Sequence, residues 1–164
     1  MCRAYNYFML ANMFCMPYDK AKNDKQLGLP YLTEPEVKLN PTYKRGNMTE
    51  LYNHIQADIE EGLPLVNGSY YTVPKYHFNK RAAYALATRF YLFTEQWEKA
   101  IEAATMCLGD NPAAMLRDWK AMAAMTHSFD AISYQFINAD ENANLLLLTS
   151  YSAAGLFFGP YRYN

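Results

Sequence analysis

The sequence predicts a mainly α-helical protein with long loops and one short strand near the C-terminus. Apolar residues recur every three or four positions in several stretches, which is the spacing of an amphipathic helix. Glycine or proline follows most of these stretches and ends them. The chain has 164 residues, of which 51% are apolar, and this is enough for the packed core of one domain.

The first two helices are expected over residues 3–16 and 49–62. Pro17 ends the first helix, whose apolar stripe contains Ala4, Tyr7, Phe8, Ala11, Phe14 and Cys15. Thr49 is the expected N-cap of the second helix, and its stripe contains Tyr52, Ile55 and Ile59. The acidic residues of the second helix, Asp58, Glu60 and Glu61, fall off this stripe. We therefore predict that they lie on a solvated face and are not a catalytic cluster.

Two further helices, over residues 79–93 and 96–108, are expected to form an antiparallel hairpin. Asn79 is the expected N-cap of the first of them, which places Ala83, Leu86, Ala87 and Phe90 in register. The second carries a stripe of Trp97, Ala100, Ile101, Ala104 and Leu108, and it ends at Gly109 and Pro112. Small residues, Ala83 and Ala87 against Ala100 and Ala104, let the two helices approach closely. The stripe is therefore predicted to be a core seam.

The remaining segments are a fifth helix, expected over residues 113–125, and long connections. Residues 17–48 carry four prolines and little periodicity, so this loop either has a function or covers the surface. The apolar run at residues 145–148 fits a short buried strand. After it, the chain closes with an aromatic loop that contains two glycines and a proline.

Composition excludes several functional classes. The 15 basic and 16 acidic residues give a net charge of −1, which argues against nucleic acid as a partner. Histidines lie at positions 54, 77 and 127 only, far from the spacing of metal ligands. The sequence has neither a glycine-rich phosphate loop nor a Gly-x-Ser-x-Gly motif. We expect no metal, no cofactor and no enzymatic activity.

Two resemblances refine the fold. Tyr84, Tyr91, Ala100 and Pro112 have the spacing of a degenerate tetratricopeptide repeat. Four stretches, in order, resemble the SusD/RagB family of nutrient-binding outer-membrane lipoproteins of Bacteroidetes. These stretches are RAYNYFMLANMFCMPY, LGLPYLTEP, TELYNHIQADIEEGLPLV and NKRAAYALATRFYLFTEQWEKAIEAA, and NADENANLLLLTSYS resembles that family more weakly.

The resemblance implies a non-enzymatic protein on the external face of the outer membrane. Such a protein binds glycans or peptides and delivers them to a TonB-dependent transporter of the SusC type. It also implies that residues 1–164 are a single partial domain with a SusD-like helical core, and that the membrane is reached through a lipid anchor absent from this chain. The alternative is a tetratricopeptide-like scaffold that binds protein partners through its helical face.

The aromatic residues separate these two functions, because a ligand-binding protein places them on loops. Tyrosine is abundant, with 15 residues, and Tyr70, Tyr71 and Tyr76 fall on a predicted loop. The candidate ligand-binding residues are those of the C-terminal loop, Phe157, Phe158, Tyr161, Arg162 and Tyr163. The rings are candidates for stacking on a ligand and Arg162 for donating hydrogen bonds. The other interpretation is that these rings cover the core.

If Tyr161 stacks on a sugar, replacing it with alanine removes that contact. In the full-length protein, Tyr161→Ala is expected to weaken glycan binding by about 1–3 kcal/mol, by analogy with aromatic stacking on nucleic-acid bases. Titration calorimetry with the native ligand measures this change. Unchanged affinity would remove Tyr161 from the site.

Overall fold

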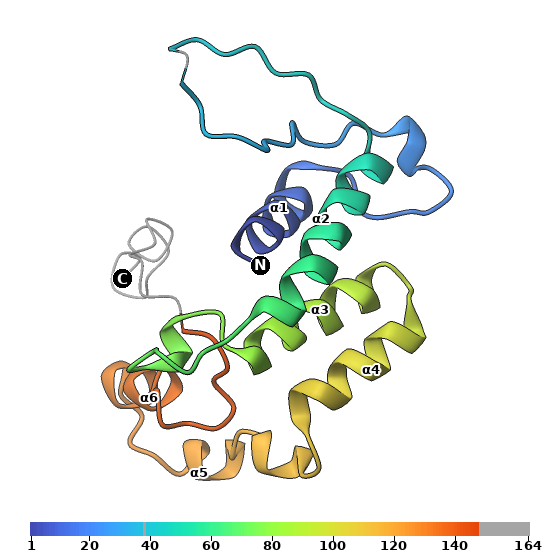
Figure 1. Ribbon diagram of the computed structural model, residues 1–164. Helices are drawn as coiled ribbons and strands as arrows, with labels where there is room; N and C mark the ends of the chain where they lie inside the picture. Colours follow the sequence, from blue (N-terminus) through green and yellow to red (C-terminus); the bar gives the residue numbers. More distant parts are fainter. Residues whose placement is uncertain (38, 148–164) are drawn as a thin grey trace.

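The computed structural model describes residues 1–37 and 39–147, and these form a helical protein (Figure 1). The helices are α1 (Cys2–Phe14), α2 (Met48–Gly62), α3 (Lys80–Phe93), α4 (Trp97–Leu108), α5 (Trp119–Ala123) and α6 (Phe129–Phe136). The mainly α-helical fold predicted from the sequence is confirmed. Residues 145–147 are not part of a strand, so the described part of the predicted strand is not confirmed.

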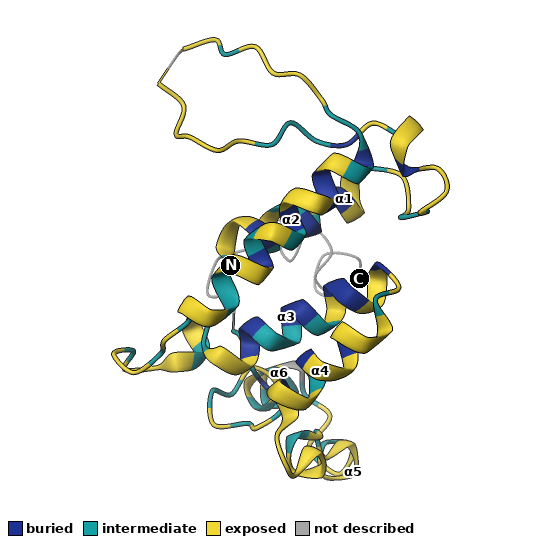
Figure 2. Ribbon diagram, turned by 45° about the vertical axis from the view of Figure 1, so that its right-hand side comes forward, coloured by how far each residue is buried: buried dark blue, intermediate teal, exposed yellow. Residues whose placement is uncertain are grey.

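Two helix pairs make up the core. Helix α1 packs against α2, and α3 packs against α4 as a hairpin (Figure 1). Three aromatic rings join the pairs: Phe8 of α1 meets Phe90 of α3 edge to face at 5.6 Å, and Tyr52 of α2 lies 6.0 Å from Phe90. Phe8 and Phe90 are fully buried. Most buried residues of α1, α2 and α3 belong to one hydrophobic cluster with these rings, and Figure 2 shows in dark blue where the three helices are buried.

The predicted stripes of α2 and α3 are confirmed, and that of α1 is confirmed in part. Tyr52, Ile55 and Ile59 are buried in α2, and so are Ala83, Leu86, Ala87 and Phe90 in α3. In α1 the buried residues are Ala4, Phe8 and Ala11. Phe14 is 66% exposed, contrary to the prediction. The buried line continues from Ala11 to the half-buried Cys15, and Phe14 lies about 100° away around the helix.

The seam between α3 and α4 is a core contact, as predicted, but it is rotated relative to the predicted stripe. The buried residues of α4 are Ala100, Ala103 and Cys107, and Ala104 is half-buried. Three members of the predicted stripe, Trp97, Ile101 and Leu108, are exposed, with Ile101 at 68%. The close approach to α3 selects the small side chains, so the large ones of α4 lie on its outer face.

Capping explains where the helices begin. Asn79 caps α3 as predicted, since its side chain accepts a hydrogen bond from the backbone N–H of Ala82 at 3.0 Å. The predicted cap of α2 is wrong: Asn47 and not Thr49 is the N-cap. The Asn47 side chain accepts from the Glu50 N–H at 2.8 Å, and the Glu50 carboxylate accepts from the Asn47 N–H at 3.1 Å. Thr49 instead donates its hydroxyl hydrogen to Asp24.

The predicted fifth helix is divided. Pro112–Met115 is a 3₁₀ turn, and α5 begins only after Asp118, whose carboxylate accepts a hydrogen bond from the Ala121 N–H at 2.9 Å. Aspartate competes with helical hydrogen bonding and favours the cap position, which accounts for the break. Helix α6 follows, capped by Ser128, and was not predicted.

The connection between α1 and α2 forms an arm, residues 29–45 apart from residue 38, that projects from the helices (Figure 1). Its base is closed by an antiparallel bridge between Leu27 and Asn47. The N–H of Gly28 donates to the Gly46 carbonyl oxygen at 2.8 Å. A Cβ at Gly28 would lie 2.6 Å from the Asn47 oxygen, so only glycine fits at this crossing.

One carboxylate ties the arm to the helices. Arg3 of α1 donates two hydrogen bonds to Asp58 of α2, the Nε bond at 2.6 Å, and Tyr31 of the arm donates its hydroxyl hydrogen to the same group. The ring of His54 stacks on Tyr31 at 4.4 Å. The Asp58 side chain is only 10% exposed, so the prediction of a solvated residue is wrong here. Its partners, Arg3 first, lower the pKa of Asp58 against the opposing effect of burial.

A charge placed in the seam is expected to unfold the hairpin. Ala100→Arg buries a guanidinium without a partner at a close helix contact, so it should lower the free energy of unfolding by more than about 3 kcal/mol. Ile101→Arg is the matched control, because Ile101 is the next residue and is exposed. Urea unfolding measures both. Equal small losses for the two variants would show that the seam is not core.

The Asp58 contact is expected to make stability depend on pH. Because the pKa of Asp58 is lowered on folding, its contribution is present above the unfolded pKa near 4 and is lost as the pH falls through the folded value. Asp58→Asn should cost about 1–2 kcal/mol at pH 7, and this difference should shrink by pH 3. Urea unfolding at both pH values checks this, with the exposed Glu61→Gln as control. A difference independent of pH would contradict it.

Candidate functional site

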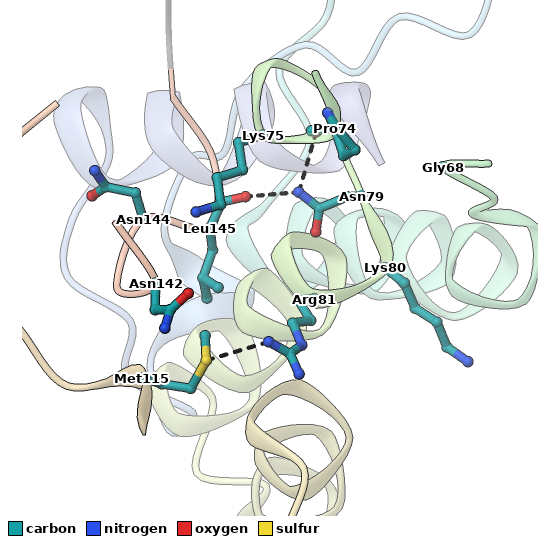
Figure 3. Close-up of a pocket in the computed structure, with 10 residues that line it drawn as sticks. All are labelled: Gly68, Pro74, Lys75, Asn79, Lys80, Arg81, Met115, Asn142, Asn144 and Leu145. Atoms are coloured by element: carbon teal, nitrogen blue, oxygen red, sulfur yellow. Dashed lines mark hydrogen bonds between the residues drawn. The ribbon is translucent and has the colours of Figure 1, made fainter. Parts of the chain in front are cut away.

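A pocket lies where three segments far apart in the sequence meet (Figure 3). The segments are the loop between α2 and α3 with the first residues of α3, the 3₁₀ turn before α5, and residues 142–145. The cavity has a volume of about 330 Å³. Its lining residues are Gly68, Pro74, Lys75, Asn79, Lys80, Arg81, Met115, Asn142, Asn144 and Leu145. We call it the Asn142 pocket.

Hydrogen bonds between the loop and the C-terminal segment build the wall of the pocket. The Asn79 side chain, besides capping α3, donates to the Leu145 carbonyl oxygen at 2.8 Å (Figure 3). The Lys75 ammonium donates to the Glu141 carbonyl oxygen at 2.7 Å. The Leu147 N–H returns a bond to the Lys75 carbonyl oxygen at 2.7 Å. The loop and residues 141–147 are therefore held as one unit.

Asn144 is the buried centre of the segment beyond α6. Its side-chain N–H group donates to the carbonyl oxygens of Phe136 and Asn138, both at 2.8 Å. Its side-chain oxygen accepts from Arg117 at 2.7 Å. A buried amide with all these bonds made fixes the local backbone, because any loss would leave a polar group unsatisfied. Asn144 thus positions its neighbour Asn142 at the pocket.

Aromatic rings stand beside the pocket on the loop between α2 and α3. The rings of Tyr71 and His77 stack at 4.0 Å, and Tyr70 meets Tyr71 edge to face at 5.2 Å. The Tyr71 ring lies within 4 Å of where Gly68, a lining residue, would carry a Cβ. Tyr70 is 72% exposed. We call Tyr70, Tyr71 and His77 the aromatic tier; it presents ring surface next to the cavity.

The polar groups that face a ligand are few. The side chain of Asn142 lies at the pocket and makes no hydrogen bond to the other lining residues drawn in Figure 3. The guanidinium of Arg81 contacts the thioether sulfur of Met115 at 3.3 Å, and sulfur is a weak acceptor (Figure 3). Leu145 and Met115 supply apolar surface. The pocket therefore combines amide and guanidinium donors with an apolar floor and neighbouring aromatic rings.

Some of the site residues predicted from the sequence lie within the described part of the structure and others lie outside it. Phe157, Phe158, Tyr161, Arg162 and Tyr163 lie outside the described residues. Tyr70, Tyr71 and Tyr76 do lie between α2 and α3, where a loop was predicted. The residues that the sequence reasoning missed are Arg81, Asn142 and Asn144. The NADENAN run was a signal for the two asparagines, since polar residues directly before an apolar run can mark a site wall.

The described residues contain neither a candidate metal site nor a helix that could span a membrane. Within residues 1–37 and 39–147, no group of three or more His, Cys, Asp and Glu side chains is arranged to hold a metal ion. In the same residues, the helices are too short or too polar to cross a membrane.

Comparison with known proteins identifies the family. The sequence profile of the SusD-like family described as "Starch-binding associating with outer membrane" matches residues 1–92. This chain belongs to the SusD-like family. The match includes α1, α2 and almost all of α3, and with them the loop that carries the aromatic tier. Among curated proteins, no sequence matches this chain.

A solved structure supports the same family. The crystal structure of a SusD superfamily protein from Bacteroides thetaiotaomicron VPI-5482, at 1.49 Å resolution, is similar to 70% of this chain with a TM-score of 0.58 and 27% sequence identity. The chain spans about a quarter, 24%, of that protein. The resemblance predicted from the four sequence stretches is confirmed, and it extends to the three-dimensional arrangement of the helices.

Proposed function

We propose that this chain is part of a non-enzymatic cell-surface protein that binds glycans, or else peptides, and delivers them to a TonB-dependent transporter of the outer membrane. The observation that carries this proposal is the aromatic tier beside the Asn142 pocket. The family description, starch binding with outer-membrane association, supports both the ligand class and the location.

The chemistry of the pocket suits a sugar. A sugar ring has an apolar face of C–H groups and an edge of hydroxyls, so a binding protein needs flat rings for the face and planar polar groups for the edge. Tyr71 and Tyr70 supply the rings. Asn142 and Arg81 supply the polar groups, and the amide of Asn142 both donates and accepts. The C-terminal residues Phe157, Phe158, Tyr161, Arg162 and Tyr163 remain proposed as further ligand contacts.

A second function, protein binding, is favoured by the outer face of the α3–α4 hairpin. Trp97 and Ile101 of α4 are more than half exposed there, and so is Leu92 of α3. Aromatic and aliphatic residues exposed together are typical of a protein interface. Within a SusD-like protein, this face suits contact with the rest of the protein or with the transporter, and in a scaffold it would be the main binding surface.

Replacing Tyr71 tests the ligand site. Tyr71→Ala removes one stacking face, so the affinity for a bound glycan should fall by about 1–3 kcal/mol. Calorimetry on the full-length protein with maltoheptaose and with trigalacturonate, one neutral and one acidic probe, measures it. Both oligosaccharides should be recovered intact after incubation.

Two matched variants give this experiment its controls. Tyr43→Ala changes an exposed tyrosine on the arm and should leave the glycan affinity unchanged, whereas Trp97→Arg changes the outer face of the hairpin and tests the second function. Absence of binding to both probes by the unmodified protein would overturn the glycan proposal. Loss of binding in Trp97→Arg with full binding in Tyr71→Ala would move the ligand to the hairpin face. A cleavage product would contradict the non-enzymatic assignment.

A further inference from the structure

We propose that the Asn142 pocket selects an acidic saccharide, a sugar that carries a carboxylate, and that Arg81 is the residue that receives this carboxylate. The inference rests on the proposed glycan binding and adds the charge of the ligand, which nothing in the family description specifies.

The pocket has an unbalanced charge. Three of its ten lining residues are cationic, Lys75, Lys80 and Arg81, and no aspartate or glutamate is among them. The whole chain has a net charge of −1, so this concentration of positive charge is local. The nearest acidic residue in the sequence of the lining segments is Glu141. Its carboxylate accepts hydrogen bonds from the Ala143 N–H and from the Gln135 side chain of α6.

Arg81 differs from the charged residues that stabilise the fold. Arg3 is paired with Asp58, Lys99 with Glu60, and Lys22 with Asp19. Within the described residues, the partner of the Arg81 side chain is the uncharged sulfur of Met115. Most of its five N–H donors, which are arranged as a planar fork, are thus left for other acceptors. A carboxylate matches this fork with two parallel hydrogen bonds.

The neighbouring groups add to the attraction for an anion. The pocket lies at the N-terminal end of the 14-residue helix α3, where the helix dipole contributes positive potential. Lys75 keeps its ammonium at the wall through the Glu141 carbonyl oxygen. Lys80 extends away from the other lining residues (Figure 3), so Arg81 is the main candidate for direct contact.

The size of the cavity and the rings of the aromatic tier indicate that the ligand is a saccharide. The cavity of about 330 Å³ is at the small end of the range for ligand sites, which suits one or two sugar rings. Tyr71 lies next to the lining residue Gly68, and one face of its ring is stacked on His77, so a sugar ring would stack on the other face. A simple anion such as phosphate would use the cations but not this ring.

The test compares an acidic oligosaccharide with its neutral forms. Calorimetry on the full-length protein uses trigalacturonate, the methyl ester of trigalacturonate and maltoheptaose. We expect trigalacturonate to bind at least tenfold more tightly than its methyl ester, which has the same rings without the charge. Arg81→Gln should reduce trigalacturonate affinity about tenfold and leave the affinity for the methyl ester unchanged.

The control variant is Arg89→Gln, which removes one exposed positive charge from the same helix two turns away from the pocket. Its affinity for trigalacturonate should match that of the unmodified protein, and circular dichroism checks that both variants fold. Equal binding of the acid and its ester would overturn the acidic-ligand inference while glycan binding stands. Binding of inorganic phosphate as tight as that of trigalacturonate would also overturn it. No binding of any saccharide would overturn the glycan proposal as well.

Discussion

The edge-to-face contact between Phe8 and Phe90 is the point at which the two helix pairs become one structure. Phe8 belongs to the α1–α2 pair and Phe90 to the α3–α4 hairpin, and both rings are fully buried. Aromatic rings bury more area than any other side chain and prefer this geometry. Tyr52 completes the cluster, and burial in it raises the pKa of the Tyr52 hydroxyl to about 12. Phe8 also meets Phe93 of the hairpin edge to face at 5.5 Å.

This contact fixes the direction of α3, and α3 in turn fixes the Asn142 pocket. The N-terminal end of α3 carries Asn79 and Arg81, while Phe90 lies near the other end of the same rigid helix. Asn79 then connects the helix start to Leu145. The Phe8–Phe90 contact in the core therefore helps to set the geometry of the Asn142 pocket, because α3 and the side-chain amide of Asn79 connect the two.

Most features that depend on residues close in the sequence could be predicted, whereas features that depend on contacts between distant segments could not. The positions of α1 to α4 and the Asn79 cap depend on residues three or four apart, so periodicity found them, although the equally local α6 with its Ser128 cap was missed. The Asn47 cap is equally local, because its partner Glu50 is three residues further on. It was missed because Thr49 is also a residue type that caps helices. Which face of α4 is buried depends on α3: hydrophobicity alone favours Trp97, whereas close packing buries Ala100 and Ala103. The pocket joins residues 66 positions apart, such as Asn79 and Leu145, and no local pattern reports such a contact.

Because the base of the arm is closed, the positions of the helices do not depend on how long the arm is. Because the chain leaves at Leu27 and returns at Asn47, which pair directly, the helices meet the same two ends whatever lies between them. Closing a flexible loop costs only about 0.6 kcal/mol more for each doubling of its length. Insertions or deletions beyond the Tyr31 anchor therefore need not disturb α1 or α2. The arm is a place where related chains can diverge in length, and acquire new surface, at little thermodynamic cost.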